Sequence, residues 1–414
     1  MGVSKNIIID LMNTSTIEDI EIIGEEWPLR WICPVFNDQY DFESNPLELD
    51  KDYEHSGTDE SKMISIQSEI IIEKRDENLF IIEEGSLWSE SHVWCKKINK
   101  SISKNIKKIV KCREKDIFIC STGVIGENIP LRPTNKAISQ SLKISENKWE
   151  SAAKSIMTTD TFPKAIGKKI IIDNKEVSIV GIAKGSGMIS PNMATMLAFI
   201  FTDALIDKAV LQTLLNIELR NSFNSITVDS DTSTNDTVLA FATGKAMEGK
   251  NERIISRTSD PRLIQFREAF SEIMHDLAIQ IVKDGEGAKK LIQIKVSGAE
   301  NSSSAKKIAR SIADSPLVKT AVGASDPNWG RIIMAIGKTK EKINPKKISL
   351  KIGSNTIIRD GEISRSYSEK RTKKYMKGKN ILLDINLGLG KGFSQMWTCD
   401  LTEGYIKINA DYRS

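Results

Sequence analysis

The sequence predicts an α/β fold in which strands and helices follow one another in mixed order. Apolar residues recur with helical spacing in some segments and form short continuous runs, typical of buried strands, in others. The chain of 414 residues, with 40% hydrophobic and 28% charged residues, has the composition of a globular protein with a sizeable core. No run approaches the roughly 18–20 apolar residues of a membrane span, and no signal peptide is apparent, so a cytoplasmic location is expected.

The elements of the first half of the chain become clear only after about residue 106. Apolar runs at residues 7–9, 64–72 and 80–82 are candidate strands, whereas residues 38–61 are polar and acidic and predict a loop. Next come six segments, expected in turn to be strand, turn, helix, hairpin, strand and helix: residues 116–120, 121–126, 135–156, 169–181, 196–202 and 203–220. The hairpin is expected around Asp173-Asn174-Lys175-Glu176, since such residues favour turns.

The second half predicts further strands and helices in mixed order. Residues 262–282 have apolar side chains at helical spacing, and residues 304–313 predict a second helix. A turn-rich run is expected at residues 229–236. Strands are expected at five places: residues 225–228, 291–296, 347–352, 381–387 and 405–409.

The net charge of +4 conceals an uneven distribution. Residues 1–95 contain 22 acidic and 6 basic side chains, a net charge of −16, so the rest of the chain carries +20. Alanine is equally uneven, since none precedes Ala137. The lysines of the basic part are scattered without interleaved aromatic residues, which argues against nucleic-acid binding.

The rare residues exclude several kinds of catalytic site. The chain has three histidines, of which His275 lies on the expected helix of residues 262–282 and is interpreted as a packing or surface residue. A Ser-His-Asp triad is therefore hard to build. The five cysteines include no C-x-x-C pair, and no phosphate-binding glycine motif occurs. An enzyme with this sequence must use Ser, Thr, Lys, carboxylates and backbone amides.

The segment from Lys184 to Thr195 is the most informative. Gly181 precedes it, Gly185 and Gly187 lie within it, and it leads into the apolar strand expected at residues 196–202. Taken alone, Thr195 is most simply a strand-starting residue whose hydroxyl bonds the backbone. The alternative is an N-terminal nucleophile: cleavage before Thr195 frees an α-amine, of pKa roughly 8, that accepts the hydroxyl proton without a histidine.

Several blocks, in order, resemble those of one enzyme family. They are residues 181–204, 221–236, 285–288, 315–321, 326–331, 397–402 and 405–414. Over roughly residues 116–414 the chain resembles the self-cleaving ornithine acetyltransferase/glutamate N-acetyltransferase family of arginine biosynthesis. The resemblance implies a layered α-β-β-α sandwich and transfer of an acetyl group from N2-acetylornithine to glutamate through an acetyl-threonine intermediate.

The same resemblance implies the catalytic residues and the two chains. Cleavage between Ala194 and Thr195 would give an α chain of residues 1–194 and a β chain of residues 195–414, with Thr195 as nucleophile. Thr122 and Gly123 match the family's oxyanion-stabilising pair, and a hydroxyl beside a backbone N–H suits acyl transfer.

The substrate carries both signs of charge, so its site needs both as well. By the resemblance, Lys184 would contact the α-carboxylate and Glu286 the ornithine ammonium. Three further substrate contacts are implied: Thr159, Asn409 and Ser414. Thr158 and Thr161 stay alternatives to Thr159. Five other residues of the matching blocks are interpreted as structural, because turn carboxylates mostly cap backbone amides: Asp229, Asp231, Asp326, Trp329 and Arg331.

The implied partners are small molecules alone. The resemblance implies no metal and no cofactor, with acetyl-CoA as a further acetyl donor in some members, and no nucleic-acid or membrane partner. It also implies a heterotetramer of two α and two β chains. An amidase or aminopeptidase with the same nucleophile is the alternative enzyme.

Residues 1–95 do not resemble the family. Members of the family carry two alanine-containing blocks in this region, and residues 1–95, which contain no alanine, include neither block. Either this front has diverged, or a reading-frame disturbance upstream of about residue 100 has replaced it, which would predict an inactive protein. The charge shift slightly favours the second explanation, and reading the coding DNA in the other two frames distinguishes them.

Overall fold

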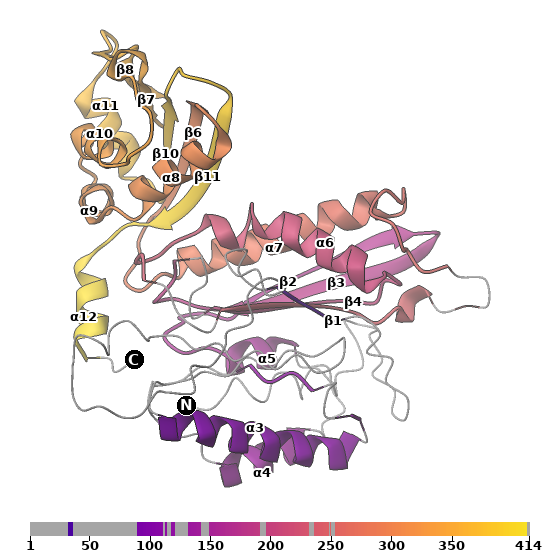
Figure 1. Ribbon diagram of the computed structural model, residues 1–414. Coiled ribbons are helices and arrows are strands. Elements are labelled where there is room, and N and C mark those ends of the chain that lie inside the picture. Colours follow the sequence, from indigo (N-terminus) through magenta and orange to yellow (C-terminus); the bar gives the residue numbers. More distant parts are fainter. Residues whose placement is uncertain are drawn as a thin grey trace, which may run out of the picture.

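A computed structural model provides the fold of this chain. It describes residues 32–35, 89–110, 112–113, 117–120, 131–141, 149–190, 196–231, 236–247, 249 and 253–411. The strands expected at residues 7–9, 64–72 and 80–82 lie outside the described residues, as do Thr122, Gly123, Ala194, Thr195 and Ser414. Two sheets are present, each with helices packed on it, which confirms the layered α/β class (Figure 1).

The first sheet has five strands in the order β1-β5-β4-β3-β2. The strands are β1 (Ile32–Val35), β2 (Lys164–Ile172), β3 (Lys175–Lys184), β4 (Leu197–Thr202) and β5 (Thr237–Ala242). The hairpin of β2 and β3 is confirmed and is longer than expected, because its turn is only Asp173-Asn174, at φ of 50° and 62°. Both residue types tolerate this left-handed backbone, which matches the twist of a two-residue hairpin.

Both faces of this sheet are buried along β3, β4 and β5, which explains the largely apolar sequence of these strands, whereas exposed and half-buried residues alternate along the edge strand β2. On one face lie α6 (Lys208–Leu219) and α7 (Leu263–Lys283), which confirm two helices expected from the sequence (Figure 1). On the other face α5 (Trp149–Ser155) packs with residues 118 and 120 against Ile182, Leu197 and Phe199. Two more helices, α3 (Ser89–Val110) and α4 (Leu131–Ser141), pack together beyond it.

The second sheet has six strands in the order β11-β6-β10-β7-β8-β9. Its strands are β6 (Leu291–Ala299), β7 (Ser349–Ile352), β8 (Asn355–Arg359), β9 (Glu362–Ile363), β10 (Asn380–Asn386) and β11 (Gly392–Cys399). Four helices contribute to its core: α8 (Ser302–Ala313), α9 (Pro316–Gly323), α10 (Trp329–Gly337) and α11 (Glu369–Met376). Buried and half-exposed residues alternate along β6 and β10, so one sheet face meets the helices.

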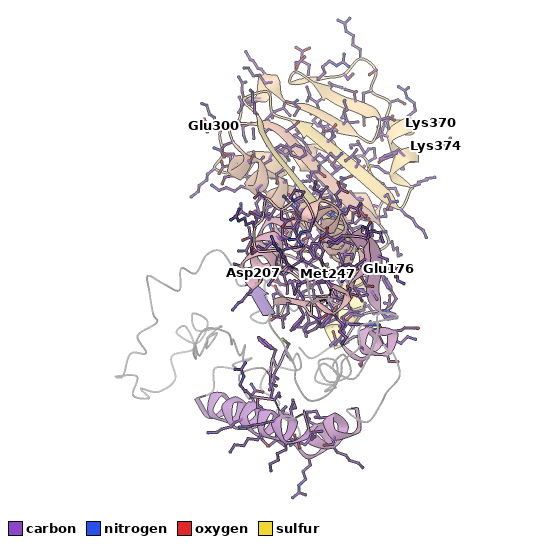
Figure 2. The ribbon with its side chains drawn as sticks, turned by 90° about the vertical axis from the view of Figure 1, so that its right-hand side faces the viewer. Glu176, Asp207, Met247, Glu300, Lys370 and Lys374 are labelled. Atoms are coloured by element: carbon purple, nitrogen blue, oxygen red, sulfur yellow. The ribbon has the colours of Figure 1, made fainter. Side chains whose placement is uncertain are left out.

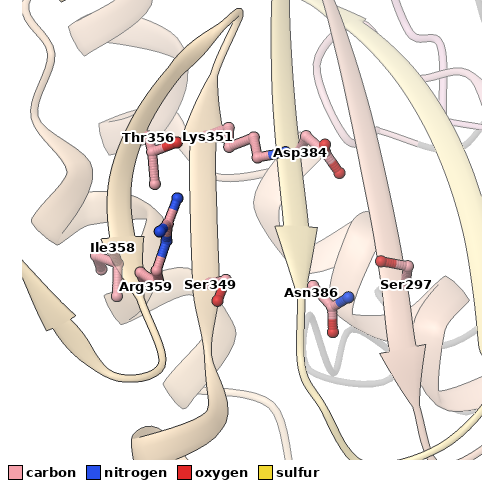
Figure 3. A pocket seen from close by; sticks show the side chains of 8 residues that line it. All are labelled: Ser297, Ser349, Lys351, Thr356, Ile358, Arg359, Asp384 and Asn386. Atoms are coloured by element: carbon pink, nitrogen blue, oxygen red, sulfur yellow. The ribbon is translucent and has the colours of Figure 1, made fainter. Parts of the chain in front are cut away.

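The open face of the second sheet is polar. It bears a hollow of about 340 Å³ lined by Ser297, Ser349, Lys351, Thr356, Ile358, Arg359, Asp384 and Asn386 (Figure 3). No residue expected at the functional site lies among these, and we do not place the site there. The first sheet with its helices forms the first unit, and the second sheet with its helices forms the second unit. Charged side chains such as Glu300, Lys370 and Lys374 extend from the second unit, whereas Met247 is enclosed in the core of the first (Figure 2).

The chain returns to the first unit at its end through α12 (Glu403–Asp411) (Figure 1). A strand was expected at residues 405–409, and this prediction is wrong. Ile406 and Ile408 alternate with Lys407 and Asn409 as in a strand, but they are 67% and 37% exposed and have no core to enter. Thr402 accepts the Gly404 N–H and starts the helix instead.

Two other expected strands are absent from the described residues. Residues 117–120 are buried but have no ladder partner, so the strand expected at residues 116–120 does not form. Residues 223–225 form a 3-10 turn, and only Ile226 makes an isolated bridge, to Trp397. His275 packs edge-on against Trp397 at 4.7 Å between ring centroids, which confirms its packing role. Among the described residues, no helix has the length and hydropathy to cross a membrane.

Candidate functional site

Three strands of the first sheet bring their ends together at one edge. Lys184 is the last residue of β3 and lies opposite Leu197, the first residue of β4. Leu197 in turn lies beside Thr237, the first residue of β5. Lys184, Met196 and Asp236 therefore lie close together at this end of the sheet, and Met196 is the residue that follows Thr195 in the sequence.

Asp236 holds the backbone of Met196. Its Oδ1 accepts the Met196 N–H at 2.6 Å, and the neighbouring Thr237 N–H binds the Met196 carbonyl at 2.9 Å. Burial raises the pKa of Asp236 well above its usual value, although the Met196 N–H and the charge of Lys184 oppose this. The residue that follows Thr195 is thus fixed on both its N–H and its carbonyl.

Lys184 is fully buried at the end of β3. Burying an ammonium requires opposite charge or hydrogen-bond acceptors nearby. Asp236 lies close enough for the positive charge of Lys184 to oppose the burial that raises the pKa of its carboxyl. The structure thus places one of the expected substrate-binding residues beside the start of β4.

Glu286 and Asn409, both expected to bind substrate, are brought together. Asn409 Nδ2 on α12 donates to Glu286 Oε2 at 2.7 Å, and only 6% of Glu286 is exposed. The Glu286 N–H donates to the Ser186 carbonyl at 3.1 Å, which ties this carboxylate to the glycine-rich turn after β3. A Cβ atom on Gly187 would overlap the carboxyl group of Glu286, so only glycine leaves this space.

Gly187→Ala tests that close approach. Because the added methyl group would push the Glu286 carboxylate aside, we expect KM for the ammonium-bearing substrate to rise by about 10-fold or more, the effect of roughly 1.4 kcal/mol. The matched control is Gly337→Ala, where a Cβ meets no atom within 4 Å. Steady-state kinetics of both variants check this, and an unchanged KM in Gly187→Ala would contradict it.

Asp229 shapes the glycine-rich turn that follows β3. Its carboxylate accepts the N–H groups of Met188 and Ile189 at 2.6 and 2.9 Å. The backbone of Met188 has a φ of 54°, which is strained for any residue other than glycine, and these two hydrogen bonds help to hold it. The structural role expected for Asp229 is therefore confirmed.

The loop before β2 contains the three candidate threonines. Thr158 donates its N–H to Asp160 Oδ2 at 3.0 Å, and Thr161 donates its N–H to Asp284 Oδ2 at 2.9 Å. Their hydroxyls bind the same carboxylates. The Thr159 hydroxyl has no hydrogen-bond partner recorded among the described residues, so it differs from the other two.

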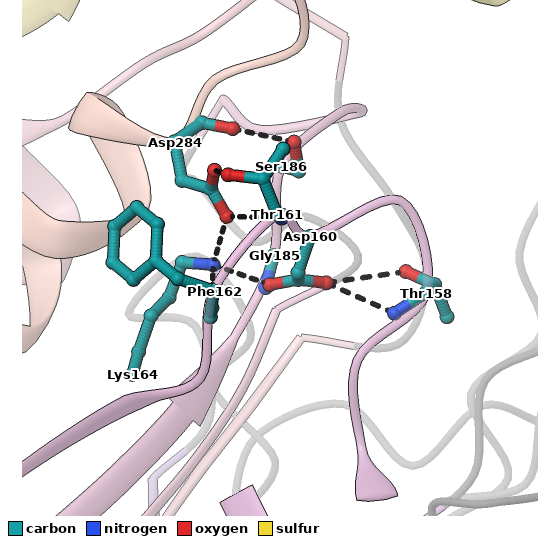
Figure 4. Close-up of polar contacts among 8 residues, drawn as sticks. All are labelled: Thr158, Asp160, Thr161, Phe162, Lys164, Gly185, Ser186 and Asp284. Atoms are coloured by element: carbon teal, nitrogen blue, oxygen red, sulfur yellow. Dashed lines mark hydrogen bonds and ion pairs between the residues drawn. The ribbon is translucent and has the colours of Figure 1, made fainter. Parts of the chain in front are cut away.

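A buried charged cluster, which sequence reasoning missed, lies beside this loop. It consists of Asp160, Lys164 and Asp284 (Figure 4). Lys164 Nζ lies 2.5 Å from Asp160 Oδ1 and 2.6 Å from Asp284 Oδ2. The available signal was Lys164 itself, a charged residue opening an apolar strand. In the described part of the chain, no group of His, Cys, Asp and Glu side chains is placed to hold a metal ion.

The ionised form of Asp160 is favoured in the folded protein. Burial raises the pKa of Asp160, but the charge of Lys164 and hydrogen bonds from Gly185, Lys164 and Thr158 outweigh it and lower the pKa below 3.8. A depressed pKa stabilises the fold at higher pH, and this stability is lost as the pH falls through the lowered value.

Asp160→Asn is therefore expected to be less stable than the unmodified chain at pH 7. The difference should shrink as the pH falls below 3.8, the ordinary value for the carboxyl, because a protonated Asp160 resembles Asn. Urea unfolding of both proteins at pH values from 7 to 3 measures this. A stability difference that stays constant over the range would be inconsistent with a lowered pKa.

Comparison with known proteins identifies a family that matches most of this chain. The model of the ArgJ family matches residues 95–414. The "Arginine biosynthesis bifunctional protein ArgJ" of Caulobacter vibrioides is 48% identical over 316 residues, which cover 76% of this chain and 77% of that protein. The protein of the same name from Agrobacterium fabrum is 44% identical over 335 residues, 81% of each chain.

A solved structure gives the same family name. The arginine biosynthesis bifunctional protein argJ of Bacillus halodurans is 40% identical, with a TM-score of 0.47, and the match covers 51% of this chain and 96% of that one. The resemblance expected from residue 116 onward extends back to residue 95 in the match to the family model, where the acidic segment ends.

Proposed function

Because this chain belongs to the ArgJ family, we propose that it transfers the acetyl group of N2-acetylornithine to glutamate in arginine biosynthesis. The reaction is an acyl transfer through an acetyl-threonine intermediate on Thr195. One observation carries the assignment of the site. The end of β3 with Lys184, the anchored Met196 after Thr195, and the Glu286–Asn409 pair all adjoin the same glycine-rich turn.

The substrate contacts follow from charge. N2-acetylornithine has an α-carboxylate, which we assign to Lys184, and a side-chain ammonium, which we assign to Glu286 held by Asn409. Thr159 is favoured over Thr158 and Thr161 because the hydroxyls of the latter two are engaged by Asp160 and Asp284. Ser414, at the end of the chain after α12, is the remaining proposed contact.

The proposed chemistry needs no histidine. Cleavage between Ala194 and Thr195 gives chains of residues 1–194 and 195–414 and frees the Thr195 α-amine. This amine takes the hydroxyl proton while Oγ1 attacks the acetyl carbonyl carbon, and Thr122 with the Gly123 N–H stabilises the oxyanion. The amide C–N bond then breaks, and the proton passes to the ornithine amine.

Glutamate completes the cycle. Its amine attacks the threonine ester, the ester C–O bond breaks, and the proton released by the new amide returns to Thr195 Oγ1 through the α-amine. N-acetylglutamate leaves, and the enzyme is restored without any other reactant.

Two measurements on the purified protein test this function. Denaturing mass spectrometry is expected to show two fragments that meet at Ala194/Thr195, and a single intact chain would contradict the proposal. Release of ornithine from N2-acetylornithine is expected to require glutamate. Equal release without glutamate would instead indicate an amidase that uses water as acceptor.

Three further proposals accompany this function. Acetyl-CoA serves as a second acetyl donor for glutamate, which an assay of acetyl-CoA with glutamate tests. The processed fragments form a heterotetramer of two α and two β chains, which native mass spectrometry tests. Transfer itself requires no metal or cofactor, and the cytoplasmic location stays a prediction.

A further inference from the structure

The buried cluster of Asp160, Lys164 and Asp284 joins a loop, a strand and the end of a helix. Asp160 lies in the loop before β2, next to Thr159, Lys164 opens β2 opposite Ala183, and Asp284 follows α7. The side chains of Asp160 and Lys164 are 0% exposed and that of Asp284 is 2% exposed. Two carboxylates and one ammonium are thus enclosed together, although Lys164 and Asp284 are 120 residues apart along the chain.

Stability alone gives little reason to keep such a cluster. Removing charges from water costs about as much as their attraction returns, so apolar residues of similar volume often stabilise a core equally well. Buried ion pairs are better suited to fixing one arrangement, because each charged group accepts only a few partner positions.

Asp160 and Asp284, which Lys164 holds together, each bind the glycine-rich turn that follows Lys184. Asp160 Oδ1 accepts the N–H of Gly185 at 2.8 Å, the residue directly after Lys184 (Figure 4). The backbone carbonyl of Asp284 accepts the Ser186 hydroxyl at 2.5 Å. The Ser186 carbonyl then accepts the N–H of Glu286.

A continuous series of contacts therefore links the loop before β2, the glycine-rich turn after β3 and the residues that follow α7. It runs from Asp160, beside Thr159, to Gly185, beside Lys184, and through Ser186 to Glu286. Gly185 has φ of 149° and allows the turn that these contacts require. A shift in the charged cluster would change the separation between Lys184 and Glu286.

We propose that Asp160, Lys164 and Asp284 are positioning residues that set the separation of the two charge-binding side chains and so select the length of the amino-acid substrate. This proposal rests on the assignment of Lys184 to the carboxylate and Glu286 to the ammonium. Ornithine has a fixed number of methylenes between these groups, and lysine has one more. A rigid separation rejects the longer molecule, whereas a loosened one accepts both.

The test compares N2-acetylornithine with N2-acetyllysine as acetyl donors to glutamate. For the unmodified enzyme we expect a kcat/KM ratio of about 10–200, the usual discrimination for one methylene. In Lys164→Met and Asp284→Asn the ratio is expected to fall toward one, with KM for N2-acetylornithine rising. Asp284→Asn keeps the size of the side chain and serves if Lys164→Met does not fold.

A control separates positioning from simple destabilisation. Leu383→Ala opens a cavity in the core of the second unit, at a fully buried residue outside the proposed site, and lowers Tm. It is expected to keep the ratio of the unmodified enzyme. If a variant stays uncleaved, the ratio of its dissociation constants for lysine and ornithine is measured instead and compared with that of uncleaved Thr195→Ala.

The outcomes distinguish the two levels of inference. An unmodified enzyme that moves no acetyl group from N2-acetylornithine would refute the proposed function itself. An active enzyme that does not prefer N2-acetylornithine would overturn the positioning role. So would Lys164→Met and Asp284→Asn variants that keep the full preference while losing as much Tm as Leu383→Ala.

Discussion

Thr195→Ala is expected to leave the purified protein as one chain and to abolish acetyl transfer. The substitution removes the hydroxyl that we propose attacks both the scissile peptide and the acetyl group, so both reactions would lose their nucleophile. Loss of a nucleophile typically costs about 10⁶-fold in kcat. Denaturing mass spectrometry and a glutamate-dependent assay of ornithine release measure the two effects.

Thr195→Ser is the matched variant. Serine keeps an Oγ beside the α-amine, so fragments of residues 1–194 and 195–414 and a reduced but measurable transfer are expected. If Thr195→Ala still transferred acetyl groups, Thr195 would be removed from its role. If Thr195→Ser were cleaved but wholly inactive, the threonine methyl group would be needed to orient the hydroxyl.

Segments with a strong local pattern were predictable from the sequence. Helix α7 has ten buried residues at helical spacing, so its bounds were expected almost to the residue. The β2–β3 hairpin was recognisable from Asp173-Asn174, because few residue types accept the backbone of such a turn. In both cases the local preference and the tertiary packing favour the same structure.

Segments whose structure depends on distant partners were not predictable in this way. Residues 117–120 have the apolar composition of a strand but find no neighbouring strand among the described residues. In α12 the alternation of Ile406 and Ile408 suggested a strand, whereas the capping residue Thr402 favoured a helix. Asn409 contacts Glu286 from this helix, so these two expected site residues meet although the element expected for Asn409 was wrong.

The candidate site shows the same division. Lys184, Glu286 and Asn409 were expected through a family resemblance, and the structure places them around one turn. Asp160, Lys164 and Asp284 were missed, because a buried ion cluster has no periodicity and its members lie far apart in the sequence. Asp236 was likewise missed, since its partner is a backbone N–H rather than another motif.

Asp236→Ala is expected to reduce both cleavage and transfer strongly. It leaves the buried Met196 N–H without its acceptor, a loss of about 1–3 kcal/mol, and frees the residue directly after Thr195. Misplacing a reacting group by about 1 Å costs roughly 10²-fold in rate, so we expect kcat to fall by about that factor. Active-site-titrated kinetics and the rate of fragment formation measure these effects.

Asp236→Asn identifies the reason for that loss. Burial favours the neutral form of Asp236, as its raised pKa indicates, and the Asn amide oxygen still accepts the Met196 N–H. We therefore expect Asp236→Asn to keep kcat within about 10-fold of the unmodified enzyme. Should Asn prove as damaging as Ala, the negative charge facing Lys184 would be the essential property, and the backbone anchor at Met196 would be secondary. The pair of variants thus decides whether this carboxylate serves the nucleophile through geometry or the substrate-binding lysine through charge.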